Sequence, residues 1–169
     1  NDCVSSECLI PERPEILDFY VIENAWVDNE GRLKPEVHFT ITNNKFENQY
    51  FDAYIIIFNE TDLSVEMEYP ILQFDNIGEE IDSISQSIKI GITSYSYPPE
   101  KYKYQLIIKS VDKNYYQYVK SLDDYNLSRN PDFSNSSIVP TNLFTNIENG
   151  YGIFCGYSQA ISDIIEPIY

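Results

Sequence analysis

Residues 101–126 read KYKYQLIIKSVDKNYYQYVKSLDDYN and decide the fold class. In the first half, apolar residues alternate with mostly polar ones at Tyr102, Tyr104, Leu106 and Ile108. This alternation is typical of a strand with one buried and one exposed face. After Asp112 the apolar residues recur every three to four positions instead of every second one. On a helix, one narrow stripe would then hold Tyr115, Tyr118, Val119, Leu122 and Asn126. The stretch therefore predicts a strand that leads directly into a helix.

The residues before this stretch predict several paired strands. Alternating patterns occur in residues 17–26, 36–42, 63–69 and 84–92, whereas residues 50–58 are almost continuously apolar, as expected of a central strand. In the second of these strands the buried face would hold Val37, Phe39 and Ile41, so His38 should face outward. Residues 28–31 (DNEG) predict a hairpin turn and not a calcium loop, because they lack the ligand spacing of an EF-hand. Pro70 should end its strand.

Towards the C-terminus, the pattern predicts a packed loop over residues 128–146 and a last strand over residues 151–156, with Phe154 in the core. About seven short strands and one late helix favour an all-β fold. We therefore predict an antiparallel, immunoglobulin-like β-sandwich with one α-helix inserted before the last strand. Residues 1–14, which carry two prolines and two cysteines, should be a leader or tether, and residues 15–169 a single sandwich domain.

Composition excludes several classes of function. Asp and Glu number 27 against 11 Lys and Arg, so the net charge of −16 would repel nucleic acid and anionic lipid headgroups. The longest apolar run, residues 53–58, is too short to span a bilayer. Three cysteines and one histidine make a structural zinc site improbable. Cys3 and Cys8 would close a small ring in an oxidising compartment, whereas Cys155 is expected to be a buried thiol.

The sequence offers few candidates for chemistry. Ser158 lies in GYSQA, a variant of the G-x-S-x-G nucleophile elbow, but such a serine needs a base and His38 is far upstream. Neighbouring acids, such as those at residues 79–82 and 123–124, are expected by chance in so acidic a chain. We therefore predict no enzyme, no cofactor and no metal. Tyr95 and Tyr97, beside two prolines, are candidates for an aromatic platform that binds a sugar or peptide, or for packing across strands.

Four segments of the C-terminal third resemble the ending of a large lipoprotein family of Bacteroidetes. The segments are YYQYVKSL (residues 115–122), NPDF (130–133), VP (139–140) and NIENGYGIFCGY (146–157). The family is domain of unknown function 4249, whose members end in a helix with YxYLKSL, a Pro-Phe segment and NIxNGxGIFxGY. The family members that the segments resemble are longer, with an additional N-terminal β module that this chain is expected to lack, and they usually have glycine in place of Cys155.

The resemblance implies an exported cell-envelope protein, held at the outer membrane by lipid and working beside TonB-dependent receptors. It implies no catalytic residues. The anchor would be Cys3 or a removed cysteine before Asn1, so the membrane is expected to be contacted only through an N-terminal lipid. The first hypothesis is a non-enzymatic accessory subunit that binds a partner or peptide ligand. The alternative is a glycan-binding or adhesion module of the cell surface.

Overall fold

The computed structural model describes residues 6–91, 101–129 and 142–169, apart from the side chains of residues 123 and 127–129. Contacts between residues divide the chain into two compact units. The larger unit comprises Glu12–Ser110 and Gln159–Tyr169. The smaller unit comprises Val111–Ser158 together with the N-terminal residues up to Pro11. The helix therefore belongs to a long insertion near the end of a chain that is otherwise mostly strands.

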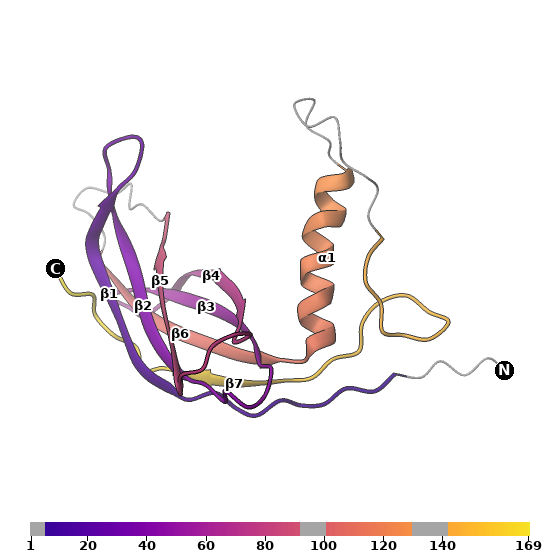
Figure 1. Cartoon of the computed structure of the whole chain (residues 1–169). Helices are drawn as coiled ribbons and strands as arrows, with labels where there is room; N and C mark the ends of the chain where they lie inside the picture. Colours follow the sequence, from indigo (N-terminus) through magenta and orange to yellow (C-terminus); the bar gives the residue numbers. More distant parts are fainter. Residues whose placement is uncertain (1–5, 92–100, 130–141) are drawn as a thin grey trace. The chain divides into compact units, whose positions relative to one another are not determined.

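The described residues form seven strands and one helix (Figure 1). They are β1 (Ile16–Val27), β2 (Leu33–Thr42), β3 (Tyr50–Asn59), β4 (Val65–Asp75), β5 (Ser83–Lys89), β6 (Tyr102–Val111), α1 (Lys113–Arg129) and β7 (Tyr157–Ile161). The strands make two antiparallel sheets, in the orders β1-β2-β5 and β4-β3-β6-β7. Constant-type immunoglobulin domains place the fourth strand in the first sheet, whereas here β4 pairs with β3. The predicted sandwich of about seven strands, with one helix before the last, is confirmed.

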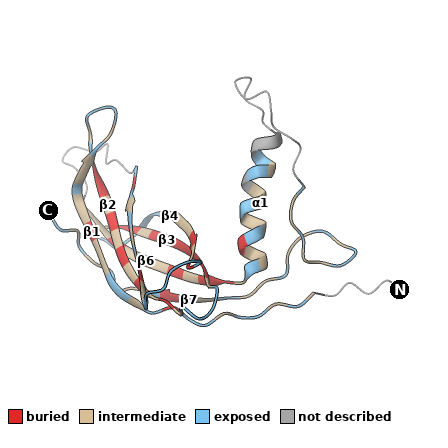
Figure 2. Cartoon of the chain, viewed as in Figure 1, coloured by how far each residue is buried: buried red, intermediate tan, exposed pale blue. Residues whose placement is uncertain are grey.

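The core lies between the two sheets of the larger unit. Val37, Phe39 and Ile41 are buried on the predicted face of β2, and β3 is buried along most of its length, as expected of a central strand. Figure 2 shows these buried residues along β2, β3 and β6. Phe74 on β4 packs against residues of both sheets, with ring centroids 5.0 Å from Phe51 and 6.1 Å from Phe39. Apolar contact between the sheets is therefore the main source of stability for this unit.

The β1–β2 hairpin turn forms where it was predicted. The Asp28 carboxylate accepts hydrogen bonds from the main-chain N–H groups of Glu30 and Arg32, both at 2.9 Å, and from the Arg32 Nε at 2.8 Å. These bonds, above all the one from the Arg32 main chain, lower the pKa of Asp28 to about 2. Asp28 therefore uses its carboxylate oxygens to close the turn.

Strand β4 differs from the prediction in two ways. It continues past Pro70 to Asp75, so the expectation that Pro70 ends the strand is wrong. Pro70 lies opposite Tyr54 beside a register shift, and an edge strand accepts proline because one side needs no main-chain donor. Its first six residues are all exposed, including Val65 at 61% and Met67 at 43%. An edge strand has a neighbour on one side only, so alternation overestimates burial here.

The last strand is also placed later than predicted. Residues 151–156 contain no strand, and β7 begins at Tyr157. The expectation that Phe154 is a core residue is wrong, because its side chain is 54% exposed. The physical reason is local: the Asn146 side chain accepts a hydrogen bond from the Phe154 N–H at 2.9 Å and donates one to the Phe154 carbonyl at 2.7 Å. The main chain of Phe154 is thereby satisfied outside a sheet.

The helix α1 forms as predicted, but its most buried residue is not on the predicted stripe. Asp112 begins the helix as its N-cap, with its carboxylate 2.7 Å from the main-chain nitrogen of Asn114. Tyr116 is buried, whereas Tyr115, Val119 and others on the predicted stripe are only half-buried. Tyr116 lies about 100° around the helix axis from Tyr115, so it is buried outside the predicted stripe, whose apolar residues form the half-buried face.

Glu23 on β1 and Tyr104 on β6 join the two sheets through a polar contact inside the larger unit. The Tyr104 hydroxyl donates to a Glu23 carboxylate oxygen at 3.2 Å. Burial raises the pKa of Glu23 above its ordinary value of 4.5, and the hydrogen bond from Tyr104 opposes this only in part. The ionised carboxylate is therefore less favourable in the folded protein than in the unfolded chain.

Replacing Glu23 with Gln should stabilise the protein at pH 7 and reduce its pH dependence. Because the folded pKa is raised, the folded state binds more protons than the unfolded chain as the pH rises above about 4.5. The contribution of protonated Glu23 to the free energy of unfolding is therefore present below pH 4.5. It is lost as the pH rises through the pKa that Glu23 has in the folded protein. Melting temperatures of both proteins at pH 4 and pH 7 check this. The prediction would be contradicted if the melting temperatures of both proteins changed equally between pH 4 and pH 7, or if the variant were the less stable protein at pH 7.

Candidate functional site

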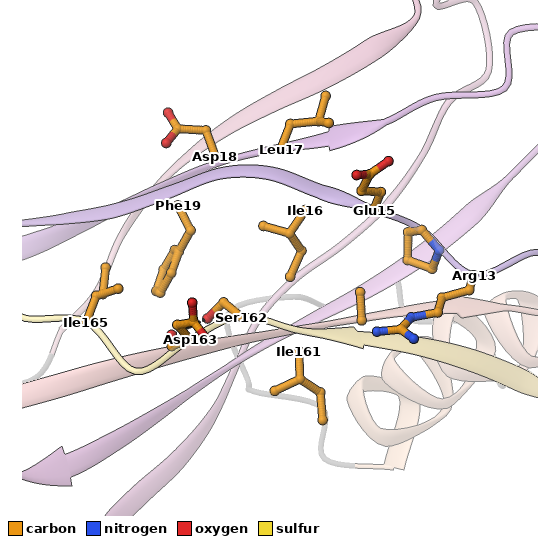
Figure 3. A pocket seen from close by; sticks show the side chains of 12 residues that line it. Arg13, Glu15, Ile16, Leu17, Asp18, Phe19, Ile161, Ser162, Asp163 and Ile165 are labelled. Atoms are coloured by element: carbon orange, nitrogen blue, oxygen red, sulfur yellow. Dashed lines mark hydrogen bonds between the residues drawn. The ribbon is translucent and has the colours of Figure 1, made fainter.

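A hollow in the larger unit lies between the start of β1 and the end of β7 with the residues that follow it. It has a volume of about 610 Å³ and is lined by residues 13–19 on one side and by residues 160–163 and 165 on the other. We call it the edge groove. Figure 3 shows Ile16 and Phe19 pointing into the groove from β1, with Ser162, Asp163 and Ile165 facing them. The volume is within the range of common ligand sites.

The floor of the edge groove is apolar and continuous with the core. Ile16, Phe19 and Ile165 are half-buried and pack against the core cluster, and Ala160 is buried. Leu17 and Asp18 point away from the groove in Figure 3 and are exposed. A ligand in the groove would therefore meet apolar side chains below it and the main chain of β1 beside it.

The two walls of the groove are sheet edges. β1 is the outer strand of one sheet and β7 the outer strand of the other. Beyond the groove, the C-terminal segment closes the gap between the sheets. Ile165 exchanges two main-chain hydrogen bonds of 2.9 Å with Tyr104 of β6, and Ile168 bridges to Ile22 of β1 in parallel orientation. The edge groove is thus the part of this gap that the C-terminal segment leaves open.

The main chain of β1 offers unused hydrogen-bonding groups along the groove. Ile168 donates to the Val21 carbonyl at 2.8 Å and accepts from the Glu23 N–H at 2.9 Å, both on the side of β1 away from β2. Residues of an antiparallel strand alternate in the side to which their main-chain groups point. The register from Asp18 to Ile22 is unbroken, so Phe19 also directs its N–H and C=O away from β2. Phe19 has no strand partner there among the described residues.

Acidic residues predominate around the groove. Glu15 and Asp163 line it together with one cation, Arg13, and Asp18 lies beside it on β1 with its carboxylate directed away from the groove. A second hollow of about 370 Å³ shares Arg13, Pro14 and Glu15 with the groove and adds Glu12 and residues of the β2–β3 loop. Among the described residues, none of the four carboxylates forms an ion pair. The groove therefore favours a cationic ligand.

Several of the site residues that the sequence suggests lie in parts of the chain that the structure does not describe. Tyr95, Tyr97 and Cys3 lie outside the described residues, so the aromatic platform, the lipid anchor and the Cys3–Cys8 ring stay predictions. Cys8 and Cys155 are half-buried residues of the smaller unit and form no disulfide with each other. Burial, with a smaller contribution from Cys8, raises the pKa of Cys155. Within the described part of the chain, no cluster of His, Cys, Asp and Glu side chains could hold a metal ion.

The residues considered for hydrolysis have other surroundings. The His38 ring stacks on Tyr20 with centroids 4.7 Å apart, and its Nε2 is 3.7 Å from the Glu36 carboxylate. The Ser158 hydroxyl is buried on β7 and has no hydrogen-bond partner among the described residues. Nothing in these contacts supplies Ser158 with a base.

The NIENGYGIFCGY segment has structural roles at several positions. Asn146 hydrogen-bonds the main chain of Phe154, as described above. The turn between them places Asn149 at φ +58° and Gly152 at φ +112°, and the φ of Gly152 favours glycine. A Cβ on Gly156 would lie only 3.0 Å from the Ile10 side chain. These roles explain the composition of the segment through packing and turn geometry.

Replacing Asn146 with Ala should loosen this segment and leave the sandwich intact. The variant loses both side-chain hydrogen bonds to Phe154, and an exposed pair of this kind contributes about 1–2 kcal/mol. Amide hydrogen exchange at Phe154 should accelerate at least about fivefold, with no change in the core amides of β3. Unchanged exchange at Phe154 would show that these two hydrogen bonds do not hold the segment.

Comparison with known proteins gives one family. Residues 1–162 match the family described as Domain of unknown function (DUF4249). No curated protein and no solved structure matches the chain. Within the described residues, no helix is long and apolar enough to cross a membrane. Since the match covers nearly the whole sequence, the chain belongs to the DUF4249 family.

Proposed function

We propose that this chain is the binding module of a non-enzymatic outer-membrane lipoprotein that works beside a TonB-dependent receptor. The observation that carries the proposal is the edge groove, which combines an apolar floor with an unpaired strand edge. Such a surface suits the binding of another polypeptide better than catalysis on a small molecule. Family membership supports the cell-envelope setting through the resemblance described above.

The acidic surface agrees with this proposal. A net charge of −16 opposes close approach to anionic headgroups and nucleic acid, so the membrane would be contacted through an attached lipid. A single acyl chain gives marginal binding, and stable anchoring takes more than one signal. A receptor in the same membrane would supply such a second contact.

A tagged native precursor, expressed in its own host, tests the proposal. We expect the protein to partition with membranes and to copurify with a TonB-dependent receptor at near-equal abundance after gentle extraction. Cys3→Ser tests whether Cys3 is the anchor, and Cys8→Ser is the matched control. If both variants stay with membranes, the anchor precedes Asn1. Native protein that is wholly free of membranes would refute the lipoprotein proposal.

Glycan binding is the second candidate function, and one observation favours it. On the outer face of the β1-β2-β5 sheet, Tyr20 and His38 stack with nearly parallel rings, 5° apart. The same face carries hydroxyl groups at Thr40 and Ser85, whose oxygens are 2.9 Å apart. Flat rings beside hydroxyls suit a sugar. Signal on a carbohydrate array that Tyr20→Ala abolishes would favour this function, whereas an array without signal would oppose it.

A further inference from the structure

The occupant of the edge groove can be inferred from the chemistry of its walls. We propose that the groove binds an extended, basic peptide segment of the partner, which adds to β1 as a new strand beside Phe19. This inference rests on the proposed binding function and names the chemical class of the partner segment. It uses the main chain of β1, the apolar floor and the uncompensated carboxylates.

The main chain of β1 selects a polypeptide over other ligands. Outward N–H and C=O groups recur at every second residue of a strand, and an extended peptide presents partners at the same spacing. The C-terminal segment already uses this edge, because Ile168 exchanges hydrogen bonds with Val21 and Glu23. The proposed peptide would extend the same kind of pairing along β1 into the open part of the gap.

The side chains around the groove predict the pattern of the bound segment. Directly opposed residues on neighbouring strands share a face of the sheet. Residues opposite Phe19 would lie over the apolar floor, and residues opposite Asp18 would lie beside its exposed carboxylate. The segment should therefore alternate apolar residues with Lys or Arg. The register of β1 shifts between Ile16 and Asp18, and Ile168 already pairs beside Val21, so the open stretch of regular strand is residues 18–20. It spans about 10 Å at about 3.3 Å per residue, which is enough for about three paired residues.

Charge supports the basic half of this pattern. Glu12, Glu15, Asp18 and Asp163 surround the groove and its neighbouring hollow, against Arg13 alone. A cationic segment would be attracted to this region, and the remaining negative surface of the chain would increase the rate of encounter. An acidic or uncharged segment would gain the main-chain hydrogen bonds without this attraction.

Selection from a random ten-residue display library on the folded full chain tests the inference. We expect enriched peptides to alternate apolar residues with Lys or Arg over about three positions. For the best synthetic peptide, Asp18→Lys in the protein should weaken binding about tenfold or more. Glu66→Lys on β4 changes the net charge equally, and it should alter the affinity less than about twofold because Glu66 lies on the opposite edge strand of its sheet.

The peptide itself supplies a control for strand addition. N-methylation of two alternate peptide nitrogens removes main-chain donors but keeps every side chain and charge, and should weaken binding about tenfold or more. The inference is overturned if no peptides are enriched, if the enriched peptides lack alternation, or if Asp18→Lys and Glu66→Lys act equally. Binding that tolerates N-methylation also overturns it. Because this test uses purified protein, its failure is distinguishable from failure of the membrane and receptor test.

Discussion

Replacing Asn76 with Ala should lower the free energy of unfolding by about 3 kcal/mol or more. Asn76 follows β4 and is buried, and its side chain connects three parts of the β2–β3 loop. Its Nδ2 donates to the Asn43 Oδ1 at 2.7 Å, the Asn44 carbonyl at 3.1 Å and the Glu47 carbonyl at 2.8 Å, while its Oδ1 accepts from the Gln49 N–H at 2.7 Å. Removing one amide leaves several buried groups unsatisfied, each at a cost of about 1–3 kcal/mol.

Urea unfolding monitored by circular dichroism measures this effect. Ile77→Ala is the matched control, because the neighbouring Ile77 side chain is 59% exposed and its loss should change stability by less than about 0.5 kcal/mol. Equal stabilities of the Asn76 and Ile77 variants would show that the buried amide network does not hold this end of the sandwich.

Phe51→Ala should have an effect of similar or greater size, about 4 kcal/mol. Phe51 is fully buried on β3, and its ring stacks on Phe74 with centroids 5.0 Å apart. The variant loses the transfer free energy of the ring and leaves a cavity that the surrounding strands cannot fill completely.

The chain offers a matched control for this substitution as well. Phe46 lies in the β2–β3 loop and is 87% exposed, so Phe46→Ala should change the urea midpoint little. Both substitutions remove the same phenyl ring, once from the core and once from the surface, so the difference between them measures the effect of burial. A small change for Phe51→Ala would mean that β3 is not the central strand of the core.

Much of the sandwich is predictable from local sequence. Val37, Phe39 and Ile41 alternate with polar residues because one face of β2 meets the core and the other does not. The nearly continuous apolar run of β3 reflects a strand buried on both faces. The turn at residues 28–31 contains acids, an asparagine and a glycine, and Asp28 closes it with its own carboxylate. In each case the physical cause acts over a few residues.

The errors occur where non-local partners decide the structure. Met67 alternates like a buried residue, but β4 lies at a sheet edge and leaves it exposed. Residues 151–156 have the pattern of a strand, yet Asn146 satisfies the main chain of Phe154 and β7 begins later. The helix pattern likewise identifies α1 but not Tyr116 as its buried residue. Single-sequence patterns contain no information about which neighbour a segment will have.

The edge groove could not be predicted for the same reason. Its two walls, residues 13–19 on one side and residues 160–163 and 165 on the other, are far apart in the sequence, and neither carries a recognisable motif. The sequence did indicate that β1 is a strand. The open gap between the two walls depends on where Ile165 and Ile168 pair, which only the assembled sheets define.

Site-specific cross-linking in native membranes tests the central claim most directly, because it asks which face of the sandwich meets the partner. A photoreactive amino acid would replace Leu17, which is 52% exposed beside the edge groove, and Glu66 on β4 in a matched control. We predict a cross-link from position 17 to an extended, basic segment of a TonB-dependent receptor, and little or none from position 66. Cross-linking to the receptor only from position 66, or equally from both positions, would contradict the assignment of the groove as the docking site.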